Sequence, residues 1–79
     1  MTLLNATPGK WFRVVSLGER RGLRAHLRRY GLFEGDRVRV VRAAPLKGPL
    51  LIEVNGREIA LGRSVAAQII VEAEECDSP

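Results

Sequence analysis

The sequence predicts a mainly β fold, a small five-stranded barrel with one helix between the first two strands and a short helical turn before the last strand. The chain has 79 residues, the length of one domain, which buries only roughly 60% of its unfolded surface. Gly31 to Gly35 separates a basic amphipathic segment from the valine-rich Val38 to Val41. Asn55-Gly56 stands between two apolar segments and is the strongest short hairpin signal in the sequence.

The first strand is predicted over Lys10 to Leu17, which is rich in bulky and β-branched residues. A helix follows and starts near Gly22. Leu23, Leu27 and Tyr30 recur at intervals of four and three, so they are expected on one stripe of this helix that faces the core.

The helix is expected to end at Gly31, because glycine readily takes the left-handed conformation just beyond a helix. Leu32 then stands where a side chain commonly folds back onto the last turn, here onto Leu27. The second strand is predicted over Asp36 to Ala44, with the valines pointing inward, the arginines between them pointing to water, and Pro45 ending the strand.

Leu50 to Val54 and Arg57 to Leu61 form the predicted hairpin, and a two-residue turn gives it one continuous apolar face. In the same register Glu53 opposes Glu58, which is unfavourable unless an arginine lies beside the pair. This like-charge pair is the weak point of the predicted register.

Ser64 is the predicted cap of a helical turn through Val65 to Ala67, and Ile69 to Ala73 is the predicted last strand. Residues 1–74 are therefore expected to form a single domain, and residues 75–79 a flexible acidic tail.

Five short strands cannot bury their apolar faces as a flat sheet, so closure into an SH3-like barrel is expected. An OB-like barrel is the nearest alternative. In that fold the helix usually lies between the third and fourth strands, and the segment from Leu50 to Leu61 leaves no room for one.

The net charge of +4 conceals an asymmetry, because the last eight residues are acidic and contain no lysine or arginine. Arginines cluster on the helix and the following strand: Arg20, Arg21, Arg24, Arg28, Arg29, Arg37, Arg39 and Arg42. A solvated polar face is the ordinary explanation, and attraction of phosphates or of an acidic protein surface is the functional one. Nucleic-acid binding is not expected, since no aromatic residues alternate with the arginines.

The inventory of reactive side chains is thin: one histidine, His26, and one cysteine, Cys76. No catalytic residue, cofactor site or metal site is predicted, because His26 has no recognisable partner and neither GxxxxGK[ST] nor GxGxxG is present. The acidic tail could hold a cation only loosely. The longest apolar run is far shorter than the roughly 20 residues of a membrane span, so no direct membrane insertion is expected.

Apolar residues and turn-forming glycines and prolines follow a regular order from the helix to the last strand: Leu27, Gly31, Leu32, Gly35, Val38, Val40, Pro45, Gly48-Pro49, Gly56, Ala60-Leu61, Ala66 or Ala67, and Ile70. In order and spacing this run resembles the FeoA family, small accessory proteins of ferrous iron transport. The resemblance implies an SH3-like barrel, a cytoplasmic location, no enzymatic activity and action alongside FeoB, a membrane ferrous iron transporter with a cytosolic nucleotide-binding domain. Gly62, Val65 and Tyr30 depart from the pattern of the family. These departures affect surfaces and one edge of the core, and they do not threaten the fold.

A docking role is therefore the predicted function, in which the barrel offers a groove or a strand edge to the transporter. The candidate partner contacts, chosen for charge clustering and for apolar exposure in a loop, are Arg24, Arg28, Arg29, Leu46 and Lys47. The alternatives are a basic SH3-like barrel that binds nucleic acid and a self-associating protein, since a homo-oligomer through exposed strand edges is compatible with the pattern.

Overall fold

A computed structural model describes residues 1–74 of the chain. The predicted acidic tail, residues 75–79, lies outside the described residues, so the boundary between domain and tail stays a prediction.

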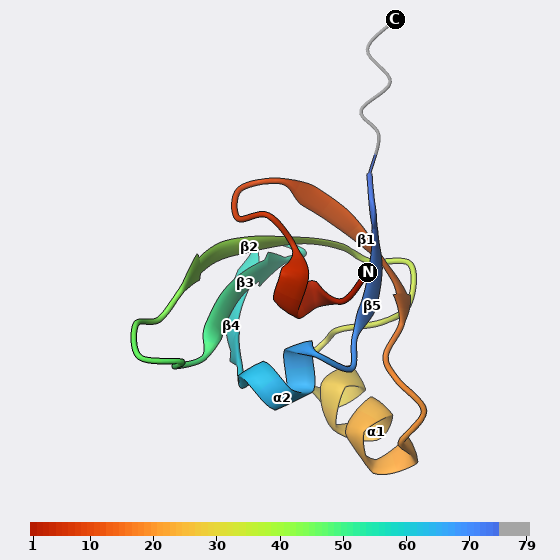
Figure 1. The fold of residues 1–79 in the computed structure, drawn as a ribbon. Helices are drawn as coiled ribbons and strands as arrows, with labels where there is room; N and C mark the ends of the chain where they lie inside the picture. Colours follow the sequence, from red (N-terminus) through yellow and green to blue (C-terminus); the bar gives the residue numbers. More distant parts are fainter. Residues whose placement is uncertain (75–79) are drawn as a thin grey trace, which may run out of the picture.

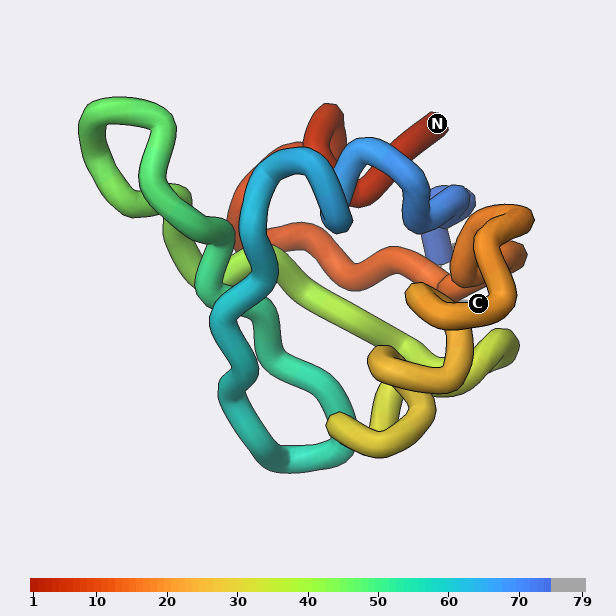
Figure 2. The backbone as a smooth tube through the Cα atoms, turned by 90° about the horizontal axis from the view of Figure 1, so that it is seen from below, coloured from red at the N-terminus to blue at the C-terminus, as the bar shows by residue number. Residues whose placement is uncertain are grey.

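Five antiparallel strands form one sheet in the order β4-β3-β2-β1-β5. The strands are β1 (Trp11–Ser16), β2 (Arg37–Ala43), β3 (Leu50–Val54), β4 (Arg57–Leu61) and β5 (Ile70–Ala73). The helices are the 3₁₀ helix η1 (Leu3–Asn5), α1 (Arg21–Arg29) between β1 and β2, and α2 (Arg63–Ala66) before β5. The sheet curls around a common interior, and α1 and α2 lie side by side at one end of it (Figures 1 and 2). The predicted mainly β architecture, with its helix between the first two strands, is confirmed.

Apolar side chains from all five strands meet in a single core, which Leu3, Leu17, Leu27 and Leu32 complete. No polar or charged residue is buried among residues 1–74. Val38 and Val40 point inward as predicted, because alternate residues of a strand face opposite sides of the sheet.

The end of α1 follows the predicted pattern. Gly31 has a φ of +90°, its N–H donates to the Arg28 carbonyl at 2.9 Å, and the N–H of Leu32 donates to the Leu27 carbonyl at 3.0 Å. These two bonds form a Schellman motif, which turns the Leu32 side chain into the core. The prediction for Tyr30 is wrong: its side chain is 50% exposed, because the stripe ends at Leu27 and Leu32 takes the core position beyond it.

The hairpin between β3 and β4 has the predicted register. Asn55 and Gly56 have φ values of 52° and 79°, as a type I′ turn requires, and Glu53 pairs with Glu58 across the strands. Arg39 on β2 pairs with Glu53 and forms an ion pair with it. The arginine on the neighbouring strand thus relieves the like-charge contact that made this register doubtful.

Helix α2 begins at Arg63, and its cap is Gly62 rather than the predicted Ser64. The Gly62 carbonyl accepts hydrogen bonds from Val65 at 3.1 Å and Ala66 at 3.0 Å. Ser64 is therefore already inside the first turn. The strand β5 starts at Ile70, since Ile69 still donates to the Ala66 carbonyl at the end of the helical turn.

The first residues of the chain, for which no structure was predicted, pair with β5. Thr2 bridges Ile70, the N–H of Leu3 donates to the Ile69 carbonyl at 2.9 Å, and the N–H of Val71 donates to the Met1 carbonyl at 2.8 Å. The segment covers part of the outer edge of β5 and buries Leu3 completely.

Candidate partner-docking surfaces

The outer face of the sheet carries arginines that are already paired with carboxylates. Arg13 lies 3.4 Å from Glu74, and Arg37 Nε lies 2.5 Å from the other oxygen of the same carboxylate. Arg39 pairs with Glu53. These ion pairs neutralise most of the positive charge on this face, so it attracts an anionic partner weakly.

Trp11 lies close to two of these arginines. The guanidinium carbon of Arg37 is 4.9 Å from the centroid of the Trp11 ring, and that of Arg39 is 5.0 Å from it, which is cation–π geometry. Reasoning along the sequence missed this cluster, because the aromatic residue and the arginines come from different strands. The register between β1 and β2, which pairs Trp11 with Arg39, was the signal needed to find it.

The arginine side chains of α1 differ in the hydrogen bonds and ion pairs that they form. Arg24 Nη1 donates to the Gly18 carbonyl at 3.1 Å, which ties the helix to the loop after β1. Arg28 Nη2 lies 3.3 Å from the carboxylate of Glu34. Arg29 makes no ion pair or side-chain hydrogen bond within residues 1–74. Of the three arginines predicted as partner contacts on this helix, it is therefore the one whose guanidinium is free.

The pKa of Glu34 lies below its ordinary value, first because its own backbone N–H donates to the carboxylate and then because Arg28 does. A lowered folded-state pKa contributes stability above the unfolded-state pKa, and this contribution disappears as the pH falls through the folded-state pKa. We therefore expect Glu34→Gln to lower the free energy of unfolding slightly near pH 7 and to match the parent protein under acid. Urea unfolding across this range tests the prediction, and a difference that does not vary with pH contradicts it.

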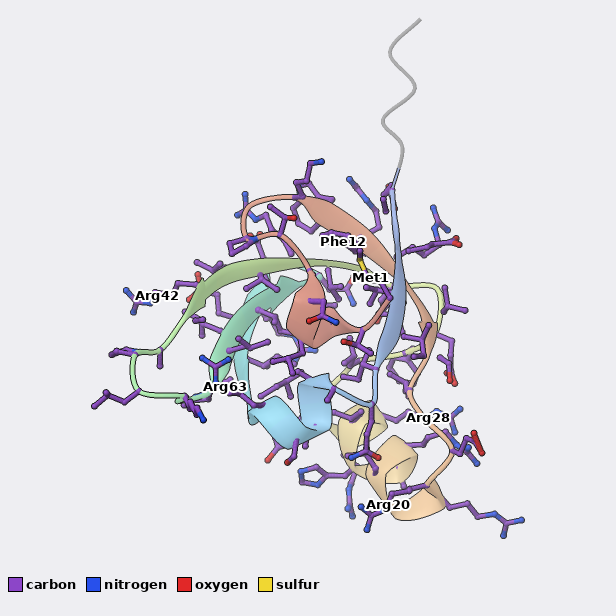
Figure 3. All side chains as sticks on the ribbon, in the orientation of Figure 1. Met1, Phe12, Arg20, Arg28, Arg42 and Arg63 are labelled. Carbon is purple, nitrogen blue, oxygen red and sulfur yellow. The ribbon has the colours of Figure 1, made fainter. Side chains whose placement is uncertain are left out.

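An open groove of about 440 Å³ runs between α1 and α2. Two half-buried apolar residues, Leu23 and Val65, pack against the core beneath it. The other residues that line it are Arg20, Gly22, His26, Arg29, Ser64 and Gln68. None of these residues is acidic. Arg20 is labelled at this end of the molecule in Figure 3.

The connection between β2 and β3 ends in a strained turn. Leu46 and Lys47 have φ values of 58° and 59°, and the N–H of Gly48 donates to the Pro45 carbonyl at 3.1 Å, as in a type I′ turn. Asparagine and glycine favour these two positions, and a leucine there carries a steric cost. The Leu46 side chain is 98% exposed. The turn thus holds a large apolar side chain in water in an unfavourable backbone conformation.

The structure does not bring the predicted contact residues together. Arg24, Arg28 and Arg29 lie on α1, whereas Leu46 and Lys47 lie at the tip of the loop between β2 and β3, on the other side of the molecule (Figures 1 and 2). The longest dimension of the molecule is 40 Å. The five residues therefore belong to two surfaces: the helix surface, with the groove beside α1, and the loop tip.

Residues 1–74 contain neither a metal-binding cluster of side chains nor a membrane-spanning helix. No group of three or more His, Cys, Asp and Glu side chains is placed to hold a metal ion within this range. No helix of the described part of the chain has the length and apolar character needed to cross a membrane.

Residues 1–73 match the model of the FeoA domain family. Iron(II) transport protein A from Clostridium thermocellum is 30% identical with a TM-score of 0.86, and the match covers 92% of this chain and 45% of that one. The FeoA protein from Chlorobium tepidum is 29% identical with a TM-score of 0.87, over 99% of this chain and 74% of that one. The present chain thus spans less than half the length of the Clostridium protein.

A third similar structure is FeoA from Stenotrophomonas maltophilia in complex with zinc, which is 29% identical with a TM-score of 0.76, over 91% of this chain and 89% of that one. It is described as a prokaryotic SH3 domain protein and as a candidate activating factor of bacterial ferrous iron transport. The SH3-like fold predicted from the sequence agrees with this description. A comparison with curated proteins found no match.

Proposed function

The chain belongs to the FeoA domain family, and from this premise we propose that it is a non-enzymatic, cytoplasmic accessory protein of ferrous iron uptake. It acts by binding the cytosolic side of a FeoB-like membrane transporter, through the single domain of residues 1–74. The family and the similar iron transport proteins support the process, and the two exposed surfaces of this small barrel support binding as its mode of action.

The loop tip is the observation that carries the docking proposal. Single exposed leucines are ordinary on protein surfaces, but Leu46 is almost fully exposed in a backbone conformation that leucine disfavours. Strained residues of this kind cluster at functional sites. The tip therefore supplies an apolar anchor for a pocket on the partner, with the Lys47 ammonium beside it for a carboxylate.

Binding to the transporter is the direct test. The purified protein is titrated against detergent-solubilised FeoB-like transporter, with and without nucleotide, at two salt concentrations. Saturable binding supports the accessory role, and a difference between nucleotide states shows that the nucleotide cycle gates docking. No binding under any of these conditions, with the barrel folded by circular dichroism, overturns the proposal.

A double substitution at the loop tip separates binding from stability. We expect Leu46→Asn with Lys47→Gly to stabilise the fold by about 1 kcal/mol, because Asn-Gly suits the type I′ turn. The same variant is expected to bind the transporter about tenfold more weakly, because the apolar anchor is lost. Thermal unfolding and the transporter titration measure the two effects.

Lys47→Gly alone is the matched control for this variant, since it relieves strain at one position and keeps the Leu46 side chain. It is expected to retain most of the affinity. Unchanged transporter binding by the double variant contradicts the assignment of the loop tip.

The arginines of α1 remain proposed contacts, and their environments decide how each is tested. Arg29→Glu changes only an exposed charge. Arg24→Glu also removes the hydrogen bond to the Gly18 carbonyl, and Arg28→Glu turns the ion pair with Glu34 into a repulsion. Arg29→Glu is therefore the clean test of the helix contact, and transporter affinity unchanged by it counts against that contact.

Nucleic-acid binding is the alternative function, and the Trp11 cluster is the observation that favours it, since an aromatic ring with arginines close to it is the combination that holds a base once the arginines turn to phosphates. The ion pairs of Arg37 and Arg39 with carboxylates oppose it. Trp11 is the only tryptophan of the chain, so its fluorescence reports directly on stacking. We expect no quenching by single-stranded RNA at physiological salt; salt-sensitive quenching without transporter binding selects the alternative.

A further inference from the structure

We propose that the groove between α1 and α2 binds an acidic peptide segment of a partner protein, with one apolar side chain of the segment on the groove floor and its carboxylates on the arginines of the rim. This site lies apart from the loop tip and does not depend on the transporter being the source of the segment. The two helices that line the groove can be followed in Figures 1 and 3.

Charge is the first argument for an acidic occupant. Arg20 and Arg29 line the groove from α1 and the residue before it, His26 lies between them in sequence, and no lining residue is acidic. Within residues 1–74 neither arginine forms an ion pair, whereas the arginines of the sheet face do. Glu19 lines a neighbouring hollow that Arg20 also borders, but the two side chains form no ion pair. The rim therefore presents uncompensated guanidinium groups, which match carboxylates in planar geometry.

The floor of the groove adds an apolar requirement. Leu23 on α1 and Val65 on α2 are half-buried, line the groove and pack against the core. Gly22 contributes no side chain, and nothing lies within 4 Å of the position that its Cβ would take. The volume of about 440 Å³ accommodates a leucine-sized side chain together with its backbone. A simple anion or a phosphate leaves this apolar floor uncovered.

Polar groups at the α2 side are suited to a peptide backbone. The side-chain amide of Gln68 donates to the Ser64 carbonyl at 3.1 Å, so its oxygen remains able to accept a hydrogen bond. The Ser64 hydroxyl makes no hydrogen bond within the described part of the chain. The N–H and the carbonyl of a bound peptide can form hydrogen bonds with these two side chains. A membrane surface or a nucleic acid has no peptide backbone that needs such partners.

The lining also distinguishes a peptide from a nucleic acid. The groove has no tryptophan, tyrosine or phenylalanine on which a base could stack, and its His26 imidazole already packs edge-on against Tyr30, with 4.8 Å between the ring centroids. Stacking platforms are the usual means of holding single strands. Its cations are confined to one end of the barrel, whereas nucleic-acid affinity grows with the number of phosphates that are contacted.

The test is an NMR titration of the ¹⁵N-labelled full chain with a synthetic seven-residue peptide that has a central leucine between three acidic residues on each side. We expect saturable shifts of the backbone amides of Leu23, His26, Val65 and Gln68. Replacing the central leucine with serine, or all acidic residues with lysine, is expected to weaken binding by about tenfold or more.

Two charge-reversal pairs supply the matched comparison. Arg20→Glu with Arg29→Glu is expected to reduce peptide affinity by at least about tenfold. Arg21→Glu with Arg42→Glu changes the net charge equally at exposed positions that do not line the groove, and is expected to reduce it by less than about threefold. Val65→Thr, which keeps the side-chain shape, tests the apolar floor independently and is expected to weaken binding by about threefold or more.

Equal losses in the two charge-reversal pairs, or shifts that map outside the groove, overturn the proposal. So does tighter binding of single-stranded RNA or of vesicles containing an anionic lipid than of the peptide at the same groove amides. Transporter binding without peptide binding overturns the groove assignment and leaves the accessory role intact, so failures of the two proposals are distinguishable.

Discussion

Replacing Leu32 with alanine is expected to lower the free energy of unfolding by roughly 2–5 kcal/mol, the usual cost of truncating a fully buried leucine. Leu32 is 0% exposed and follows directly on the Schellman motif that ends α1. The substitution leaves a cavity where the helix meets the sheet and removes the apolar contact that accompanies the helix end. Small domains have a total free energy of unfolding of only about 5–15 kcal/mol, so this single substitution removes a large part of the stability of the protein.

Thermal and urea unfolding measure the loss, and a domain of this size should lose roughly 4–8 °C of Tm per kcal/mol. Phe33→Ala is the matched control, because it removes a larger side chain from the next position, where the ring is 46% exposed. Its expected cost is below about 1 kcal/mol. Similar costs for the two variants contradict the view that Leu32 joins the helix to the core.

Replacing Gly31 with alanine is expected to cost roughly 1–3 kcal/mol, because a side chain disfavours the φ of +90° that this residue adopts. A Cβ at Gly31 also clashes with the end of the Arg57 side chain, at its Nη2 atom. Arg57 can move away, but it then gives up its hydrogen bond of 2.9 Å to the Tyr30 carbonyl. The backbone conformation therefore carries most of the expected cost, and the lost bond adds to it.

Gly22→Ala is the matched control for Gly31→Ala. Gly22 lies in the first turn of α1 with open space around its Cβ position, so alanine there is expected to stabilise the protein by up to about 1 kcal/mol through helix propensity. Urea unfolding should give opposite signs for the two variants. A destabilised Gly22→Ala, or a neutral Gly31→Ala, contradicts this reading of the helix.

The elements that follow from local chemistry were predictable to within about a residue or two, the usual uncertainty of element ends. The turn at Asn55-Gly56 sets the register of its own hairpin, and the glycine at position 31 ends the helix through two backbone bonds to the preceding turn. Both depend on residues that are close together in sequence. The prediction of Ser64 as the cap of α2 was wrong, because the helix begins two residues earlier. Gly62 occupies the cap position instead.

Parts of the surfaces escaped prediction because they join residues that are distant in sequence. Trp11 and its flanking arginines meet only through the pairing of β1 with β2. The groove exists only because α1 and α2 lie side by side in the folded chain. The five predicted contacts lie on two separate surfaces because the sheet curls. Leu46 was chosen for its apolar side chain in a loop, whereas its strain is visible only in the backbone.

The sequence by itself determined the fold class, the order of the strands and helices along the chain, the helix end at Gly31 and the hairpin register. The helix end and the register are decided by the conformational preferences of a few neighbouring residues, and the fold class follows from the number and spacing of the short strands. Only the tertiary structure decided which arginines are neutralised and which remain free, because an ion pair depends on distances of a few ångströms between side chains that the folded sheet brings together. Arg39 finds Glu53 across the sheet, whereas Arg20 and Arg29, equally basic in the sequence, face the groove between α1 and α2 without a carboxylate among residues 1–74.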